Sequence, residues 1–246
     1  MIHDALRVIE SCGIQETNMS ALNANLGISF SKTTYFSKRV MEEYIRWTTD
    51  RFDKMLIIVA DHLEAFNVQV FKGYSFVEAC ERTLNTGREL RTGYLRAVPT
   101  ALAPRVTVSL ASDVLQEPGC SSLAAVVRQT GASEPAFGAD LKAAVGTGLA
   151  GKLEEAKSAG IRIDDGAMDI LQNYLIEEIA IILYLSHLAP TRYPVLIFPH
   201  FIPAVIPRIY AEQYSSIFGK ITRGQPLRAV QVVSEGRPQR TSAEKG

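Results

Sequence analysis

The stretch NLGISFSKTTYFSK, residues 25–38, runs from an apolar segment that ends in a serine, through a short polar loop, to a Tyr-Phe pair. We predict a strand over Ala21–Ser29, in which the side chains of Asn25, Gly27 and Ser29 point to one face. Gly27 leaves room for a ligand to approach the backbone, and open parallel sheets bind ligands at the carboxyl ends of their strands. Ser29 is therefore a candidate nucleophile. The alternative is that Ser29 only ends the strand and bonds to the local backbone.

Outward from this stretch, apolar runs of strand length alternate with segments of helical period, which is typical of an α/β protein whose parallel sheet is covered by helices on both faces. Further strands are predicted at Met55–Ala60, Arg105–Leu110, Tyr193–Phe198 and Leu227–Val233. Helices are predicted at Lys38–Phe52, Ser75–Arg96, in two parts over residues 121–160 with a break near Gly131–Pro135, and at Asp164–Leu188. We expect a single domain over residues 1–234 and a mobile tail over residues 235–246, which has no apolar anchor.

The composition limits the function classes. The chain of 246 residues is 47% hydrophobic and 21% charged, which excludes general disorder, and its 26 basic and 26 acidic residues give no net field that would attract polyanions. Cys12, Cys80 and Cys120 are far apart and lack metal-ligand spacing, so we expect reduced thiols in a cytoplasmic protein, with no metal and no cofactor. The longest apolar run, Ile179–Leu185, is too short to span a bilayer, and no membrane partner is expected.

A serine hydrolase is disfavoured by the residues around Ser29. The nucleophile elbow of hydrolases requires G-x-S-x-G, whereas the segment Gly27–Ser31 has a serine in place of the second glycine. No histidine lies in a recognisable triad context. Serine chemistry without histidine requires a substrate that is already activated, such as an ester whose own amine takes up the proton.

A second candidate constellation lies in the segment LQNYLIEEIAIILYLSHL. Tyr174 and Glu178 are four residues apart and therefore share one face of a helix that is apolar nearly all round. A partly desolvated carboxylate needs a cation or several donors beside it, and a bound α-ammonium group would serve. The alternative is that Glu177 and Glu178 occupy the solvated face of a helix start. Farther on, Phe198 and Pro199 end a buried strand and by periodicity belong to the core.

Taken together, these motifs resemble the cyclodipeptide synthases, closest to the subfamily in which Tyr-Pro ends the last motif. Members carry a G-[IV]-S segment at a strand end followed by Tyr-Phe-Ser, which matches residues 27–29 and 35–37. A family Tyr-x-x-x-Glu pair matches Tyr174 and Glu178, and the strand-end motif aligns with Phe198-Pro199 and the downstream Pro203. The likeness continues between the motifs and covers most of the chain.

The resemblance implies a Rossmann-like monomer similar to the catalytic domain of class I tyrosyl- and tryptophanyl-tRNA synthetases. Such a protein would use two aminoacyl-tRNAs per product and would need no cofactor. In the family chemistry the serine accepts an aminoacyl group from a first tRNA, a second aminoacyl-tRNA then reacts, and the dipeptidyl-enzyme cyclises to a diketopiperazine.

Roles carried over by motif follow from this resemblance. Ser29 would be acylated, Glu178 would hold the substrate ammonium, and Tyr174 would bind the same group or relay a proton. Asn25 and Gly27 would border the aminoacyl group, and Asn25 would favour a polar or smaller side chain. The remaining substrate-binding candidates are Ile58, Phe198 and Pro199.

Three features depart from the family pattern. The loop after Ser29 is one residue longer, so either Lys32 or Thr33 takes the variable position. Phe198 replaces a tyrosine and removes a hydroxyl near the nucleophile. The helix that carries a dense basic patch for tRNA in the family is only modestly basic here; its arginines are Arg82, Arg88, Arg91 and Arg96. A non-catalytic aminoacyl-tRNA or amino-acid binding module on the same scaffold therefore remains the alternative function.

Overall fold

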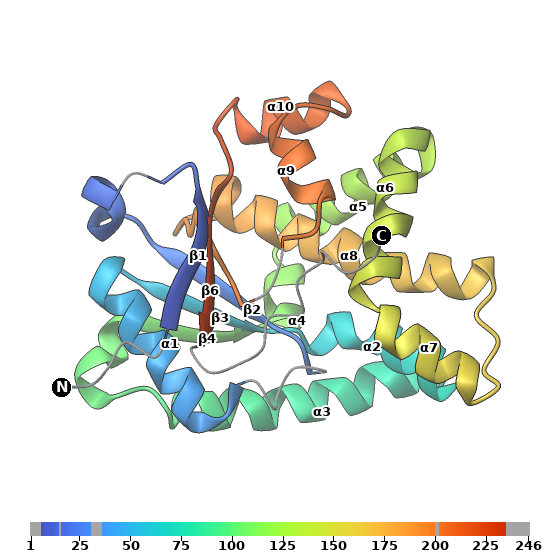
Figure 1. The fold of residues 1–246 in the computed structure, drawn as a ribbon, viewed down its shortest axis with the longest axis horizontal. Coiled ribbons are helices and arrows are strands. Elements are labelled where there is room, and N and C mark those ends of the chain that lie inside the picture. The colour runs from blue at the N-terminus through green and yellow to red at the C-terminus, as the bar shows by residue number, and fades with distance from the viewer. Residues whose placement is uncertain (1–5, 15, 31–35, 200–201, 235–246) are drawn as a thin grey trace.

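The computed structural model describes residues 6–14, 16–30, 36–199 and 202–234. Within this part of the chain lies a six-stranded sheet of order β1-β6-β5-β2-β3-β4 (Figure 1). Its strands are β1 (Leu6–Cys12), β2 (Ala24–Ile28), β3 (Met55–Val59), β4 (Val106–Leu110), β5 (Val195–Phe198) and β6 (Arg228–Ser234). The five strands β2 to β6 run parallel to their neighbours in the sheet, while β1 pairs antiparallel with β6.

The sequence predicted β2 to β6 but missed β1. This strand lies at one edge of the sheet, and Arg7, Glu10 and Ser11 interrupt its apolar residues. An edge strand with one partner is only partly buried, so its hydrophobic signal is weak. The prediction of a parallel sheet is therefore correct for β2 to β6, and β1 adds an antiparallel strand at one edge.

Both faces of the sheet are covered by helices, as predicted. Along β3, Leu56 and Ile58 belong to one core, which includes side chains of α2 (Asp61–Lys72), α5 (Pro118–Ser133) and α8 (Asp165–Leu183). Ile57 and Val59 belong to the other core with Met41 of α1 (Lys38–Arg51). Figure 1 shows α5, α6 (Pro135–Gly148) and α8 grouped together, away from α1.

The predicted helix starts are confirmed by their caps. Ser37 caps α1 by accepting from the Val40 amide. Ser75 and Glu78 form a reciprocal capping box at the start of α3 (Phe76–Leu95), in which Glu78 accepts from the Ser75 amide at 3.0 Å. Asp164 caps α8, which continues into a π-helical turn at Tyr184–Leu188.

The segment 121–160 contains three helices rather than two. The break near Pro135 is present, and Pro118 and Pro135 each occupy the first helical position, where a missing N–H costs nothing. A second break at Leu149 separates α6 from α7 (Ala150–Ser158). The break comes between Gly148 and Gly151, two residues of low helix propensity in a stretch otherwise rich in alanine.

The remaining elements are short. They are the 3-10 helices η1 (Glu16–Ala21) and η3 (Thr100–Arg105) and the helices α4 (Ala111–Leu115), α9 (Val205–Tyr210) and α10 (Ser216–Thr222). None of the helices in the described ranges combines the length and the apolar character that crossing a bilayer requires. The expected tail, 235–246, lies outside the described residues.

Candidate active site

Ser29 lies at the point where the order in which strands are added to the sheet reverses. From β2 the chain proceeds to β3 and β4 on one side, and β5 and β6 are then added on the other side. In open parallel sheets this switch point, at the carboxyl ends of the strands, is where ligands bind. Ser29 follows the last residue of β2, and the Ala60 amide at the end of β3 donates to the Ile28 carbonyl at 2.9 Å.

The Ser29 hydroxyl is bonded to the carboxylate of Glu64, a residue that the sequence analysis did not single out. Ser29 Oγ donates to Glu64 Oε1, which also accepts from the Phe30 amide at 3.1 Å. Glu64 Oε2 accepts from Asn67 Nδ2 at 2.9 Å. Ser29 therefore does more than end a strand. The available sequence signal was indirect, because α2 starts immediately after β3, the neighbour of β2, and its first turn must face the same crevice.

Tyr174 contacts the same serine from α8. Its phenol is hydrogen-bonded to Ser29, and burial, followed by the charges of Glu178 and Glu64, raises the pKa of Tyr174 well above its usual range. Tyr174 is therefore a neutral phenol. Because Ser29 gives its single proton to Glu64, the phenol is the donor in its bond to Ser29.

Glu178 lies one turn after Tyr174 and lines the same cavity. Its side chain is only partly accessible, and the neighbouring Glu177 is 8% exposed. The interpretation that both glutamates occupy a solvated helix face is therefore wrong. Ser29, Glu64, Tyr174 and Glu178 together are called the serine cluster below.

The cavity beside the serine cluster has a volume of about 220 Å³. Aliphatic side chains make up much of its wall, contributed by β2, β3, β5, α2, α6 and α8. These aliphatic residues are Ile28, Ile58, Leu63, Val145, Leu149, Leu171, Leu175, Ile181, Ile182, Leu196 and Ile197. The cavity therefore offers an apolar interior, and three members of the serine cluster, Ser29, Tyr174 and Glu178, line it.

The structure brings the predicted substrate-binding residues of β2 and β3 to this cavity. Asn25, Gly27 and Ile58 all line it, and a Cβ added at Gly27 would have no atom within 4 Å. Asn25 is buried, and its Nδ2 donates to the carbonyls of Tyr193 at 2.7 Å and Val195 at 3.2 Å. Its amide hydrogens therefore tie β2 to the chain entering β5 and are not available to a ligand.

Phe198 and Pro199 also line the cavity, together with Pro203. Phe198 is partly buried and packs against the core, as its periodicity predicted, and it also lines the cavity. The loop positions Lys32 and Thr33 and the motif residue Tyr35 lie outside the described residues.

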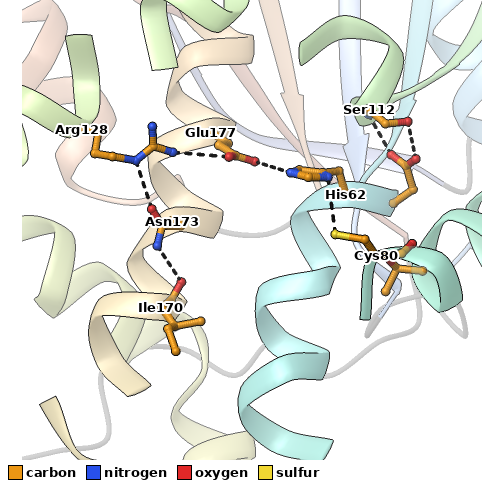
Figure 2. A network of polar contacts seen from close by, with 9 residues as sticks. His62, Cys80, Ser112, Arg128, Ile170, Asn173 and Glu177 are labelled. Carbon is orange, nitrogen blue, oxygen red and sulfur yellow. Dashed lines mark hydrogen bonds and ion pairs between the residues drawn. The ribbon is translucent and has the colours of Figure 1, made fainter. Parts of the chain in front are cut away.

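A second polar group also has members on α2 and α8 but does not line this cavity. Figure 2 shows the Glu177 carboxylate between Arg128 of α5 and His62 of α2. Glu177 Oε1 lies 3.5 Å from Arg128 Nη2, and Oε2 lies 3.4 Å from His62 Nε2. Cys80 Sγ lies 4.0 Å from His62 Nδ1. These four residues, His62, Cys80, Arg128 and Glu177, are called the Glu177 cluster below.

Burial dominates the electrostatics of this cluster. It raises the pKa of Glu177 to about 7, although Arg128 acts in the opposite direction. Burial lowers the pKa of His62, which Asp61 partly offsets. The Cys80 thiol has a raised pKa through burial and the charges of Glu177 and Asp61, so it is not an activated nucleophile.

The four arginines proposed for tRNA binding lie along α3 or at its end. Arg82, Arg88 and Arg96 are exposed, whereas Arg91 is partly covered. The Arg82 guanidinium lies over the Tyr74 ring at 4.3 Å, and Arg91 Nη1 lies 3.6 Å from Asp113 Oδ2. At least three basic groups are therefore open to solvent on this helix.

A parallel sheet with an apolar cavity and polar side chains at its switch point defines an α/β protein with a ligand-binding site at the carboxyl ends of its strands. The cyclodipeptide synthase family model matches residues 17–217. This match covers most of the chain, and the chain belongs to the cyclodipeptide synthase family. Its members are tRNA-dependent aminoacyltransferases that form cyclodipeptides, and the chain is an enzyme of this class. The family predicted from the motifs is thereby confirmed.

Solved structures share the fold at low sequence identity. A cyclodipeptide synthase from Fluoribacter dumoffii superposes with a TM-score of 0.71 at 14% identity, covering 92% of this chain and 96% of the other. A Mycobacterium tuberculosis protein, described as relating cyclodipeptide synthetases to type I tRNA synthetases, has a TM-score of 0.68 at 17% identity, with coverages of 94% and 93%. The cyclodipeptide synthase from Candidatus Glomeribacter gigasporarum bound to Phe-tRNAPhe has a TM-score of 0.60 at 13% identity, with coverages of 94% and 97%. The comparison with curated protein sequences gave no match.

Proposed function

We propose that this enzyme joins two aminoacyl groups, each delivered by a tRNA, into a cyclic dipeptide through an ester on Ser29. The observation that carries this proposal is the position of the Ser29 hydroxyl, which is held between Glu64 and the Tyr174 phenol at the wall of an apolar cavity. Covalent catalysis splits the transfer into two easier steps, so that the enzyme needs to hold only one aminoacyl-tRNA at a time.

The cavity fits the side chain of the first aminoacyl group. Its volume of about 220 Å³ and its aliphatic wall favour an apolar side chain. The preference for a polar or smaller residue, which Asn25 suggested, loses its basis because both amide hydrogens of Asn25 are bonded to the backbone. We infer an aliphatic or aromatic first amino acid.

Glu178 and Tyr174 serve the amino group of the substrate. Both line the cavity one helical turn apart, and Glu178 is the carboxylate that can face an ammonium group there. An ammonium paired with a half-buried carboxylate fixes the orientation of the ester carbonyl relative to Ser29. Tyr174, as a neutral phenol, donates hydrogen bonds and relays protons during cyclisation.

The RNA is bound through its backbone by the exposed arginines of α3. Arg82, Arg88 and Arg96, with Arg91 beside them, suit phosphates, and contacts to phosphates and helix shape need no base sequence. The relative bound to Phe-tRNAPhe supports aminoacyl-tRNA as the partner. We further infer a cytoplasmic monomer of the subfamily in which proline follows the last strand-end motif, here Phe198-Pro199.

Intact-mass analysis tests the covalent step directly. The purified protein is mixed with tRNA charged with an apolar amino acid, and an adduct of one aminoacyl residue is expected. Ser29→Ala should give no adduct, while Ser121→Ala, an exposed serine on α5, should leave the adduct unchanged. Expression in a bacterial host with mass spectrometry of the medium should reveal a diketopiperazine and name both amino acids. Lack of both adduct and diketopiperazine would contradict the proposal.

A further inference from the structure

The bond from Ser29 to Glu64 raises the question of where the serine proton goes. The Ser29 hydroxyl attacks the ester carbonyl carbon only if it loses its proton as the new C–O bond forms. An amino group of the substrate held as an ammonium by Glu178 has no lone pair and cannot take this proton. A protein group must therefore accept it, and this argument rests on the proposed function of Ser29.

The alternative acceptors near Ser29 are poorly suited. Tyr174 is a neutral phenol with a pKa well above its usual range, so it donates rather than accepts. Phe198, where the family has a tyrosine, has no hydroxyl. Of the two histidines in the described residues, His62 contacts Glu177 and His187 contacts Tyr210, and neither lines the cavity.

Glu64 is built into the fold as an acceptor directed at Ser29. The side chain is 3% exposed, and it comes from the first turn of α2, which starts at the end of β3 beside β2. Oε1 receives both the Ser29 hydroxyl and the Phe30 amide, while Oε2 receives Asn67 Nδ2 and lies 3.9 Å from Lys152 Nζ. These donors fix both oxygens, so the carboxylate needs no rearrangement before the reaction.

We propose that Glu64 is the general base that removes the proton of Ser29 during acylation, with Asn67 as its positioning residue. Ser29 Oγ bonds to the ester carbonyl carbon while its proton moves to Glu64 Oε1. The bond from that carbon to the terminal ribose oxygen then breaks, and the ribose oxygen takes the proton from Glu64. The products are the seryl ester and the free ribose hydroxyl, and Glu64 returns to its starting form.

The geometry permits both proton transfers by one carboxylate. The attacking Ser29 oxygen and the leaving ribose oxygen are bonded to the same carbon in the tetrahedral intermediate. Both therefore come within reach of Oε1, as the single base of a serine enzyme serves both oxygens in turn. Glu178 cannot take this role, because it is engaged with the ammonium group in the same complex.

The test measures the rate of adduct formation by rapid quenching and intact mass, with aminoacyl-tRNA in excess. Glu64→Gln keeps the shape and should slow acylation about 100-fold or more, the usual range for loss of a general base. Asn67→Ala should cause a smaller loss. Glu154→Gln, an exposed glutamate on α7, is the matched control and should be unchanged. Binding of charged tRNA should be the same in all variants.

A structural role for Glu64 would lower the rate without responding to added base. Glu64→Ala leaves a hole beside Ser29, and formate in the buffer should restore a measurable part of the acylation rate, with no effect on wild type or on Asn67→Ala. If Glu64→Gln acylates within about threefold of wild type, or if formate does not rescue Glu64→Ala, the general-base proposal is wrong while the covalent mechanism stands. If wild type itself forms no adduct, both proposals fail.

Discussion

The serine cluster and the Glu177 cluster both take side chains from α2 and α8, yet they differ in what lies beside them. Each contains a carboxylate that is less than one-tenth exposed, Glu64 in one and Glu177 in the other. Glu64 is bonded to a serine in the wall of a cavity, whereas Glu177 contacts Arg128 and His62 and does not line that cavity. Both carboxylates contact protein partners, but only Glu64 has a partner that lines the cavity, Ser29.

This difference shows that burial and a displaced pKa do not by themselves identify a functional carboxylate. Glu177 has its pKa raised to about 7, a value often associated with catalysis. The shift has an ordinary cause in burial, and its neighbours are side chains rather than an open volume. The proposed catalytic role of Glu64 therefore rests on the cavity beside its partner Ser29, and the two clusters can be tested against each other.

The sharpest test compares two adjacent glutamates of α8. Glu178→Gln removes the negative charge that faces the substrate ammonium, and we expect cyclic dipeptide formation to fall about 100-fold or more, because loss of one partner of a desolvated charge pair costs about 2–5 kcal/mol. Glu177→Gln should stay within about threefold at neutral pH. Initial rates of diketopiperazine formation, measured by mass spectrometry, give both values. A loss of only tenfold in Glu178→Gln would contradict its role as the ammonium anchor.

We expect the Glu177 cluster to affect the free energy of unfolding rather than the catalytic rate. Because the pKa of Glu177 is about 7 in the folded chain against an ordinary value of 4.5, the native state holds more protons than the unfolded state between these values. The free energy of unfolding therefore falls as pH rises through this window and levels off above it. His62, with a lowered pKa, has the opposite sign below its ordinary value of 6.5.

Glu177→Gln removes the contribution of position 177 to the pH dependence of the unfolding free energy and leaves the contribution of His62. The difference in unfolding free energy between variant and wild type should shift in favour of the variant by about 2–3 kcal/mol from about pH 5 to about pH 8. Urea denaturation followed by circular dichroism at several pH values measures it. A difference that does not change with pH would show that Glu177 titrates normally.

A third test concerns the packing of α3 against Asp61, the residue that precedes His62 of the Glu177 cluster. Gly87 of α3 packs against Asp61, and an added Cβ would lie 2.5 Å from Asp61 Cβ. Asp61 is fully buried and accepts from the Ser112 amide at 2.9 Å and the Ser112 hydroxyl at 2.5 Å, so it has no space to move. Gly87→Ala should therefore destabilise the fold by about 1–3 kcal/mol. Gly93→Ala on the same helix meets no atom within 4 Å and should stabilise it by about 1 kcal/mol.

These contrasts also show how far the sequence could lead. The central strands were predictable because each is a continuous apolar run buried on both faces, and the capping box at Ser75 and Glu78 marked the start of α3. Ser29, Tyr174 and Glu178 were recognised because each belongs to a motif, and the structure brings all three to one cavity. Their catalytic roles stay predictions.

The remaining features depend on contacts that no local pattern records. The bond between Ser29 and Glu64 spans 35 positions, and the position of Glu64 depends on β3 pairing with β2. The sequence does not explain why a glycine occupies position 87 in a helix. The explanation is the close approach of the Asp61 side chain, which belongs to another helix. The edge strand β1 was missed because polar residues interrupt its run of apolar residues. Predictions of this kind require the tertiary structure.

The smallest expected effect concerns Phe198, which lines the cavity where the family has a tyrosine. If Glu64 accepts the serine proton, a hydroxyl at position 198 is not needed for acylation, and Phe198→Tyr should change the acylation rate less than about threefold. In the Glu64→Gln background the same substitution should also leave the acylation rate within about threefold, because a neutral phenol does not accept the serine proton. Rapid-quench intact mass of the two single variants and the double variant forms a double-mutant cycle. A large gain from Phe198→Tyr in wild type would mean that the missing hydroxyl, and not Glu64, limits the reaction.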